Sequence, residues 1–292
     1  MPNARQIVQR IKTAGNISKI TKAMEMVSAS KMRRAQGSAL ATRPYTDALQ
    51  SSLAALASAT SSDIHPLLTE HTEGIDIAVV ISTDKGLCGS LNPTLFKETI
   101  QWVKNHPEGK VVAIGKKAVA FCRISGVELF AQFIETPDKI KSADIVPIST
   151  LITNGFLEKE FRSVNLIYMD FVSTLVQKVK IQQVLPLPKI EASEGALVDT
   201  VKESEYIFEP SADVILNNLL PYYLENSIFQ AFLEARASEH SARMVSMKNA
   251  SENAGDLMSD LRLIYNKSRQ ASITSELLDV VTALLGQTKK KV

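Results

Sequence analysis

The last quarter of the chain most limits what this protein can fold into. No proline occurs from Tyr222 to Val292, and glycine appears there only at positions 255 and 286. A helix of about 60 to 70 residues would be about 90 to 105 Å long, which is more than the diameter of any domain this chain could build. Apolar and small residues recur along it at steps of three and four, which is typical of one face of an α-helix. They are Ala254, Leu257, Leu261, Ile264, Ser268, Ala271, Leu277, Val281 and Leu284.

The beginning of the chain shows the same periodicity. Pro44 is compatible with a kinked helix, because helix-favouring residues resume after it. An amphipathic helix cannot bury its apolar stripe alone, so the helices from the two ends are expected to pair as an antiparallel coiled coil. The longer C-terminal helix should extend past its partner, and its apolar tip would then need an external sleeve. The N-terminal stripe consists of Ile7, Ile11, Ala14, Ile17, Ile20, Met24 and Val27.

Short β-branched runs alternate with helical patterns in the middle of the chain. This alternation predicts an α/β layer with a largely parallel sheet. The last two runs have no helix between them, so they should form an antiparallel hairpin at the sheet edge. The runs are Ile75–Ile81, Val111–Ile114, Val127–Ile134, Val164–Phe171 and Val179–Leu185, and the helical patterns are Pro93–Lys104, Lys116–Ile124 and about Ser142–Phe161.

These patterns together predict an α/β fold class: a long antiparallel coiled coil of the N- and C-terminal helices with an inserted Rossmann-like α/β domain. Residues 1–60 are expected to form the N-terminal coiled-coil helix and residues 74–190 the α/β domain. A polar excursion and connection would occupy residues 191–210, and residues 211–292 would form the C-terminal coiled-coil helix.

Composition narrows the function classes. The formal net charge of +2 does not by itself imply nucleic acid or an anionic membrane, and no apolar run approaches the ~20 residues of a membrane-spanning helix. Cys88 and Cys122 form no CxxC pair, and the four histidines are scattered. We therefore predict no metal site, no cofactor and no disulfide.

A glycine-containing turn at Thr83–Ser90 follows a strand and precedes a helix, which is where α/β folds bind phosphates. The turn matches neither GxGxxG nor GxxxxGK[ST], and no acidic residue closes the next strand. Cys88 is expected to be a small buried side chain and not a nucleophile. No catalytic residue is assigned, and a nucleotide-binding α/β enzyme with coiled-coil arms stays open as an alternative.

The first helix is strongly basic. Nine lysines and arginines face a lone Glu25 before Asp47, and this asymmetry suggests an acidic partner surface. Nucleic acid is a competing partner, but the chain has no aromatic interleaving and no nucleic-acid motif, so none is expected. Carboxylates of the last helix, such as Glu234 and Glu239, are expected to be solvated surface charges. The basic residues are Arg5, Arg10, Lys12, Lys19, Lys22, Lys31, Arg33, Arg34 and Arg43.

Three parts of the chain resemble, in order, the signature sequences of the γ subunit of F-type ATP synthases. They are ITKAMEMVSASKMRRAQ at 20–36, DKGLCGSLN at 84–92, and EHSARMVSMKNASENA at 239–254 followed by YNKSRQASITSEL at 265–277. Chloroplast-type members carry an inserted segment with a closely spaced cysteine pair, and this sequence has none. The resemblance is therefore to the bacterial type, and thiol regulation is not predicted.

The resemblance implies a rotor shaft that is not an enzyme in its own right. In that family the coiled coil stands inside a ring of three α and three β subunits, and the α/β domain lies on the ε subunit and the ring of c subunits. Proton or sodium flow turns the shaft, which drives ATP synthesis or hydrolysis in the ring. The chain would then bind α, β, ε, δ and c subunits and no nucleic acid. It would be a peripheral protein, attached through the Fo sector to the cytoplasmic face of a bacterial inner membrane.

The resemblance also implies residues that bind the α/β ring. Three match positions that touch catch loops of the ring, two would turn in an apolar collar, and five match the stretch facing acidic lever loops of β. Coiled-coil packing is the competing explanation for Met24 and for the apolar tip. Gly86 and Gly89 would shape the turn of the foot domain. The catch-loop residues are Arg269, Gln270 and Thr274, and the collar residues are Leu284 and Leu285. The residues facing the lever loops are Lys22, Met24, Lys31, Arg33 and Arg34.

Overall fold

The computed structural model describes residues 4–59, 65–137, 139–187, 209 and 211–288. These residues divide into two compact units. The sheet unit comprises Ser28–Arg243, and the helix-pair unit comprises the residues up to Val27 and those from Met244 onward. Apart from Glu209, the polar excursion predicted at residues 191–210 lies outside the described residues.

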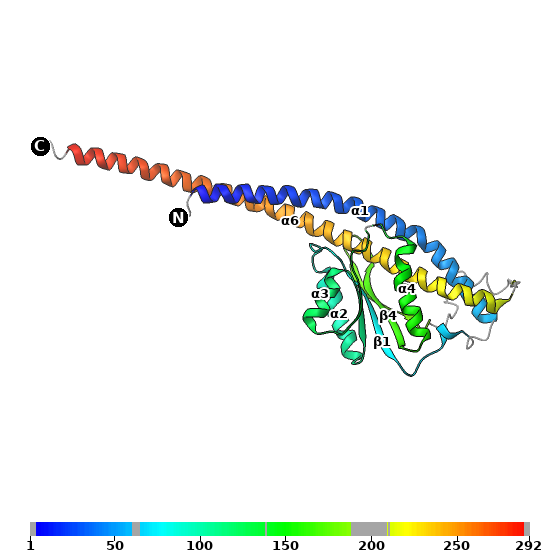
Figure 1. The fold of residues 1–292 in the computed structure, drawn as a ribbon. Coiled ribbons are helices and arrows are strands. Elements are labelled where there is room, and N and C mark those ends of the chain that lie inside the picture. Colours follow the sequence, from blue (N-terminus) through cyan, green and yellow to red (C-terminus); the bar gives the residue numbers. More distant parts are fainter. Residues whose placement is uncertain (1–3, 60–64, 138, 188–208, 210, 289–292) are drawn as a thin grey trace. The chain divides into compact units, whose positions relative to one another are not determined.

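Two long helices carry the ends of the chain (Figure 1). Helix α1 runs from Ala4 to Ala59 and helix α6 from Ala212 to Thr288. The Ser211 hydroxyl accepts a hydrogen bond from the backbone N–H of Val214 at 3.4 Å, which caps the start of α6. Pro44 lies inside α1 at an exposed position, so it does not end the helix, as the sequence allowed.

A five-stranded sheet forms the centre of the sheet unit. Its strand order is β3-β2-β1-β4-β5. The first four of these strands are parallel, and β5 runs antiparallel to β4, so the predicted edge hairpin is confirmed. The strands are β1 (Ile75–Ile81), β2 (Lys110–Ile114), β3 (Leu129–Phe133), β4 (Phe161–Phe171) and β5 (Gln177–Leu185).

Three shorter helices connect the parallel strands. Helices α2 (Leu91–Asn105) and α3 (Lys116–Ser125) lie close to their predicted ranges. Helix α4 (Ser142–Leu157) is shorter than expected, because Phe161 is already the first residue of β4 and pairs there with Ile75. A short 3₁₀ helix, η1 (Pro66–Leu68), was not predicted.

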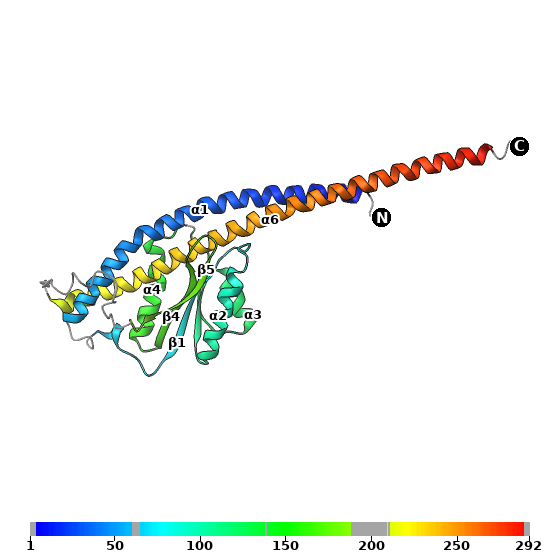
Figure 2. The same ribbon diagram turned by 180° about the vertical axis from the view of Figure 1, so that it is seen from behind.

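Both faces of the sheet are covered, which explains why β1 is an almost continuous apolar run. Ile77, Val79 and Ile81 point into a core shared with α4 and with the first part of α6. Ala78 and Val80 point into a second core shared with α2 and α3. Figures 1 and 2 show α2 and α3 on one side of the strands and α4 on the other.

The second half of α1 pairs with the first part of α6 inside the sheet unit. The Thr42 hydroxyl donates to Oε1 of Gln230 at 2.6 Å, and the Asn226 amide donates to the Thr46 hydroxyl at 3.0 Å. A later residue of α1 thus meets an earlier residue of α6, so the two helices are antiparallel, as predicted. Leu53 of α1 is completely buried in the same core.

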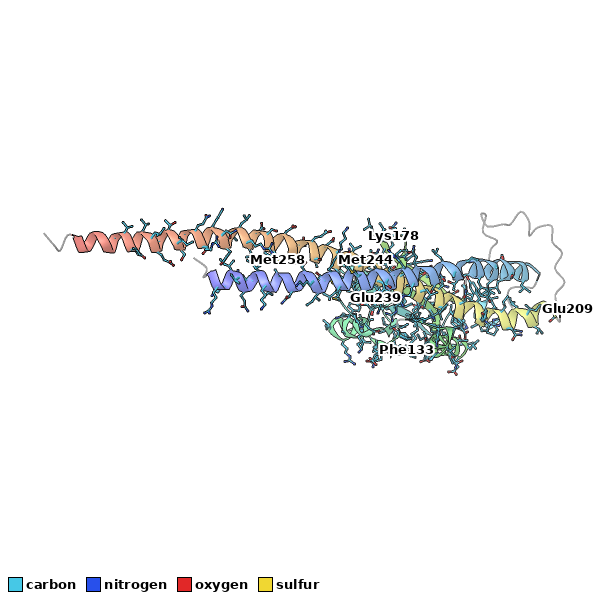
Figure 3. All side chains as sticks on the ribbon, turned by 90° about the horizontal axis from the view of Figure 1, so that it is seen from above. Phe133, Lys178, Glu209, Glu239, Met244 and Met258 are labelled. Carbon is cyan, nitrogen blue, oxygen red and sulfur yellow. The ribbon has the colours of Figure 1, made fainter. Side chains whose placement is uncertain are left out.

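The helix-pair unit is a second antiparallel contact between α1 and α6. The hydroxyls of Ser18 and Ser251 lie 3.4 Å apart. A Cβ atom added to Gly15 would be 3.3 Å from the sulfur of Met258, which Figure 3 labels. Small residues therefore let the two backbones approach closely. None of the helices in the described ranges combines the length and apolarity needed to cross a bilayer.

Candidate functional site

The carboxyl edge of the sheet is where an α/β fold of this type would bind a ligand. The chain continues from β1 towards β2 and β3 and returns to the other side of β1 with β4, so the switch point lies between β1 and β4. The cavity left there is about 10 Å³, lined by residues that include Ser82, Met169, Phe232 and Glu239. That volume is close to the smallest space that holds one water molecule. Side chains of α6 therefore fill the expected crevice.

The loop after β1 also occupies the amino end of α3. Oδ1 of Asp84 accepts a hydrogen bond from the backbone N–H of Lys116 at 3.0 Å. The Ser82 hydroxyl donates to the carbonyl of Ile114 at 2.9 Å and accepts from the N–H of Ala118 at 2.8 Å. A carboxylate of the chain thus stands where the helix end would attract an anion.

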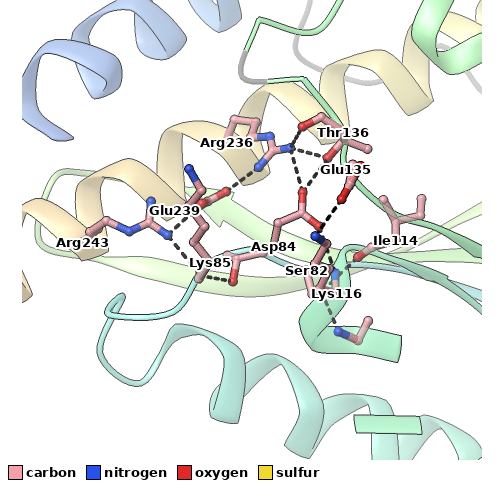
Figure 4. Close-up of polar contacts among 12 residues, drawn as sticks. Ser82, Asp84, Lys85, Ile114, Lys116, Glu135, Thr136, Arg236, Glu239 and Arg243 are labelled. Carbon is pink, nitrogen blue, oxygen red and sulfur yellow. Dashed lines mark hydrogen bonds and ion pairs between the residues drawn. The ribbon is translucent and has the colours of Figure 1, made fainter. Parts of the chain in front are cut away.

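Three charged residues of α6 hold this loop, and together with Asp84 they are called the clasp (Figure 4). Arg236, Glu239 and Arg243 follow at steps of three and four, so they lie on one face of the helix. Glu239 accepts hydrogen bonds from Arg236 at 2.7 Å and from Arg243 at 2.8 Å. Arg243 also donates to the carbonyls of Lys85 and Gly86 at 3.1 and 3.2 Å.

Arg236 joins the clasp to the segment after β3. Its Nη2 donates to the carbonyl of Thr136 at 3.1 Å and also to the Thr136 hydroxyl. The same nitrogen lies 3.9 Å from Oδ2 of Asp84. Two arginines thus face two carboxylates, so the cluster carries no net charge, and each arginine donates to backbone oxygens of the α/β part.

Burial makes the clasp different from a surface ion pair. The side chains of Arg236, Glu239 and Arg243 are 9%, 6% and 9% exposed. The prediction that Glu234 and Glu239 are solvated surface charges is wrong, because both are buried. Residues 231–241 of α6 are all buried, since α1 and the α/β part surround this stretch. An amphipathic pattern implies one exposed helix face, so the sequence pattern gave no sign that these charged residues are buried.

His240 is the most enclosed histidine of this region. It is 4% exposed, and burial lowers its pKa to about 4. Its Nδ1 atom has no hydrogen-bond partner among the described residues. Burial likewise raises the pKa of Glu234, whose Oε1 accepts from the Gln230 amide at 3.0 Å.

The two cysteines are free thiols in the interior, as expected. Cys88 lies in the loop after β1, where the Asn92 amide contacts its sulfur at 3.4 Å. Burial raises the pKa of Cys88, and it raises the pKa of Cys122 to about 11. Both thiols are therefore protonated at neutral pH, which disfavours nucleophilic attack.

The predicted ring-binding residues fall in both units. In the helix-pair unit, Lys22 is exposed and pairs with Glu25 at 3.0 Å, and Met24 is half-buried. Residues 269–282, which include Arg269, Gln270 and Thr274, are all exposed. The remaining two, Leu284 and Leu285, belong to α6, but their side chains lie outside what the structure describes.

In the sheet unit, Lys31 is half-buried, and Arg33 and Arg34 are exposed. Gly89 has a φ of 59°, which favours glycine, whereas a Cβ atom on Gly86 would have room. Contacts of all these residues with partner subunits stay predictions.

The exposed end of α6 carries a strip of apolar side chains. Leu261 is the last residue of the helix pair that is buried within the described part of α6. Beyond it, large apolar side chains are about half exposed or more. In a protein surrounded by water such side chains are usually buried, so this strip marks an interaction surface. Leu263 (62%) and Ile264 (47%) come first, and the strip nearer the tip consists of Ile273 (49%), Leu277 (61%), Leu278 (61%), Val280 (58%) and Val281 (50%).

Known proteins match this chain over nearly its whole length. A family model described as ATP synthase matches residues 3–284. A curated ATP synthase gamma chain from Glaesserella parasuis is 41% identical over 285 residues, covering 96% of this chain and 98% of that protein. One from Dehalococcoides mccartyi is 43% identical over 286 residues with the same coverage.

Solved structures show the same fold. A chain from the central stalk and c-ring of the Tetrahymena thermophila mitochondrial ATP synthase matches with a TM-score of 0.61 and 25% identity, covering 80% of this chain and 99% of that one. A chain from the Euglena gracilis mitochondrial enzyme, 16% identical, matches in fold with a TM-score of 0.68 over 99% of this chain and 96% of that one. On the extent and level of this identity, the chain belongs to the ATP synthase gamma-chain family.

Proposed function

We propose that this chain is the rotor shaft of the central stalk in an F1Fo ATP synthase. By rotating, it couples proton or sodium flow through the membrane ring to ATP synthesis or hydrolysis in the α/β ring. The observation that carries the proposal is the exposed apolar strip on α6, because a helix with such a strip requires a surrounding partner in water. The curated gamma chains support it by their similarity over 96% of this chain.

The partners follow from the same role. The chain assembles with three α and three β subunits, with the ε and δ subunits, and with the ring of c subunits. The Tetrahymena chain with the same fold belongs to a central stalk and c-ring. The chain is accordingly a peripheral component of a membrane complex, and we place it on the cytoplasmic face of a bacterial inner membrane, since both of the curated relatives described above are bacterial.

The chain itself has no active site in this proposal. The filled crevice at the switch point and the Asp84 carboxylate at the start of α3 support this, because both occupy positions that a nucleotide would need. The alternative of a nucleotide-binding enzyme is correspondingly disfavoured. Chemistry takes place in the α/β ring, and this chain transmits torque.

Two sets of residues contact the ring in this proposal. Arg269, Gln270 and Thr274 reach catch loops, and their exposure on α6 supports the assignment. The basic residues of α1 around Met24 face acidic levers of the β subunits, with Leu284 and Leu285 turning in an apolar collar. The basic residues are Lys22, Lys31, Arg33 and Arg34.

Co-expression with the α and β subunits tests the function. We expect a stable complex with three α, three β and one copy of this chain, whose ATP hydrolysis depends on the chain. A chain that elutes alone from both partners and binds nucleotide by itself would overturn the proposal.

Paired substitutions in the complete synthase test the catch contacts. Arg269→Ala with Gln270→Ala should lower coupled ATP synthesis severalfold, because charge-assisted hydrogen bonds to the ring would be lost. The adjacent exposed pair Asn266→Ala with Lys267→Ala is the matched control and should have a smaller effect. Equal synthesis rates in the first variant and the wild type would show that the assigned contacts are incorrect.

A further inference from the structure

A pocket of about 460 Å³ lies in the sheet unit, between the second half of α1, the buried part of α6 and the segment before α4. This volume is in the range of small-molecule sites. Its apolar lining includes Ile140, Phe229 and Leu233. It is separate from the crevice at the switch point, although Arg236 borders both.

The charged lining of the pocket has one sign. Lys31, Arg34 and Lys139 contribute to its wall, and none of its described lining residues is acidic. Arg236 is a fourth cation, but Glu239 and Thr136 already accept its hydrogen bonds. Among the described residues, Arg34 donates through Nε to its own helix, which leaves both Nη atoms for another acceptor.

A buried polar atom in the same wall is also without a partner. His240 lines the pocket, is 4% exposed, and has no described hydrogen-bond partner for Nδ1. His240 therefore adds a polar side chain to this wall, although Nδ1 itself is closed to solvent. A ligand that entered the pocket would displace water from the apolar floor.

We propose that this pocket binds a small organic anion, with a phosphate or carboxylate head between Arg34 and Lys139 and a flat apolar body over Phe229 and Leu233. Two or more cations around one anionic head give charge-assisted hydrogen bonds, and an aromatic body removes apolar surface from water. The inference goes beyond the rotor function, and because Lys31 and Arg34 are also assigned to the β levers above, it concerns the chain outside the assembled ring.

Calorimetric titration of the purified full-length chain with 1-naphthyl phosphate tests the site. We expect saturable binding to one site, with inorganic phosphate and neutral 1-naphthol each binding at least tenfold more weakly, because each offers half of the interaction. Binding should move the imidazole signals of His240 in an NMR spectrum of the histidine side chains. Absence of saturable binding, or equal affinity for 1-naphthol, would overturn the proposal.

Substitutions distinguish the pocket from general attraction to a basic surface. Arg34→Gln and Lys139→Gln should each weaken naphthyl phosphate binding about tenfold, and Ser38→Phe should block it by filling the volume. Arg123→Gln makes the same charge change at an exposed site of α3, outside the pocket, and should leave the affinity unchanged. If Arg123→Gln and Arg34→Gln lowered the affinity for naphthyl phosphate equally, general attraction to positive charge would explain the binding, and the proposal would be contradicted.

Discussion

Glu239 lies between two arginines that both donate to it, and all three side chains are nearly removed from water. Such a buried cluster is held together by its mutual hydrogen bonds, because each charge has lost its hydration. Arg243 connects this cluster to the loop carbonyls of Lys85 and Gly86. The consequence at the residue scale is that no member can be removed without leaving another charge buried and incompletely paired.

Breaking the clasp should therefore destabilise the fold strongly. We expect Arg243→Met to lower the free energy of unfolding by about 3 kcal/mol, because Glu239 would stay buried with one arginine fewer. Lys248→Met is the control: its pair with Glu252 is exposed on both sides and spans 4.0 Å, so its loss should cost less than about 0.5 kcal/mol. Guanidinium chloride denaturation measures both, and equal losses would contradict the role of burial.

His240 should make the stability depend on pH in mildly acidic solution. Its pKa is about 4 in the folded chain against 6.5 for an ordinary histidine, so the unfolded chain binds the proton first. Stability conferred by the neutral imidazole is present above pH 6.5 and is lost as the pH falls towards 4, by roughly 3 kcal/mol in total. Urea denaturation at several pH values should show a flatter profile for His240→Gln, and parallel profiles would disprove this linkage.

At the scale of the elements, replacing two helical glycines by alanine distinguishes the effect of helix propensity from that of packing. Gly155→Ala on α4 should destabilise the chain by about 2 kcal/mol, because the new Cβ atom would lie 2.3 Å from a ring carbon of the fully buried Phe161. Gly37→Ala on α1 meets no atom within 4 Å and should stabilise the chain by up to about 1 kcal/mol. Thermal denaturation would reveal the opposite signs, and shifts of the same sign would contradict this explanation.

The elements that could be predicted are those whose own residues show the hydrophobic pattern of a strand or a helix. The run Ile75–Ile81 is β1 in the structure, because an apolar β-branched segment bounded by turns has few alternatives. The end of α4 was overestimated, because Glu158, Lys159 and Glu160 favour a helix locally. The pairing of Phe161 with Ile75 overrides that preference, and a long-range pairing has no local signature.

The candidate site was predictable in part for the same reason. The sequence of the loop after β1 alone shows that it does not match the phosphate-binding patterns. The partner of that loop was not, because the distance from the loop to Arg243 in the sequence exceeds any local pattern. Exposure of the α6 tip followed from its length, whereas the burial of Glu234 and Glu239 depends on how the sheet and α1 surround the helix.

On the scale of the whole molecule, the apolar strip of α6 should matter only in the assembly. Leu277→Asp with Val281→Asp should leave the helix content and melting temperature of the isolated chain nearly unchanged, because both side chains are exposed. The same variant should assemble poorly with α and β subunits, since two charges would have to enter an apolar collar.

Ser272→Asp with Ser275→Asp is the matched control for that experiment. Both positions are exposed and lie on the side of the helix facing away from Leu277 and Val281. Size-exclusion chromatography of the reconstituted complexes should show assembly of the control and loss of the strip variant. Equal assembly of both would refute the view that this strip is the covered surface.

The complete burial of α6 around residues 231–241 restricts how the gene can change length over evolution. Deleting one codon between Leu224 and Arg236 would turn the clasp by about 100° relative to the core residues before it. Arg236 and Arg243 would then miss their carbonyls, while a seven-residue insertion would return them to within about 20° of their face. Lineages that lengthen or shorten this protein should therefore do so outside this stretch, and the spacing from Leu224 to Arg243 should be inherited unchanged.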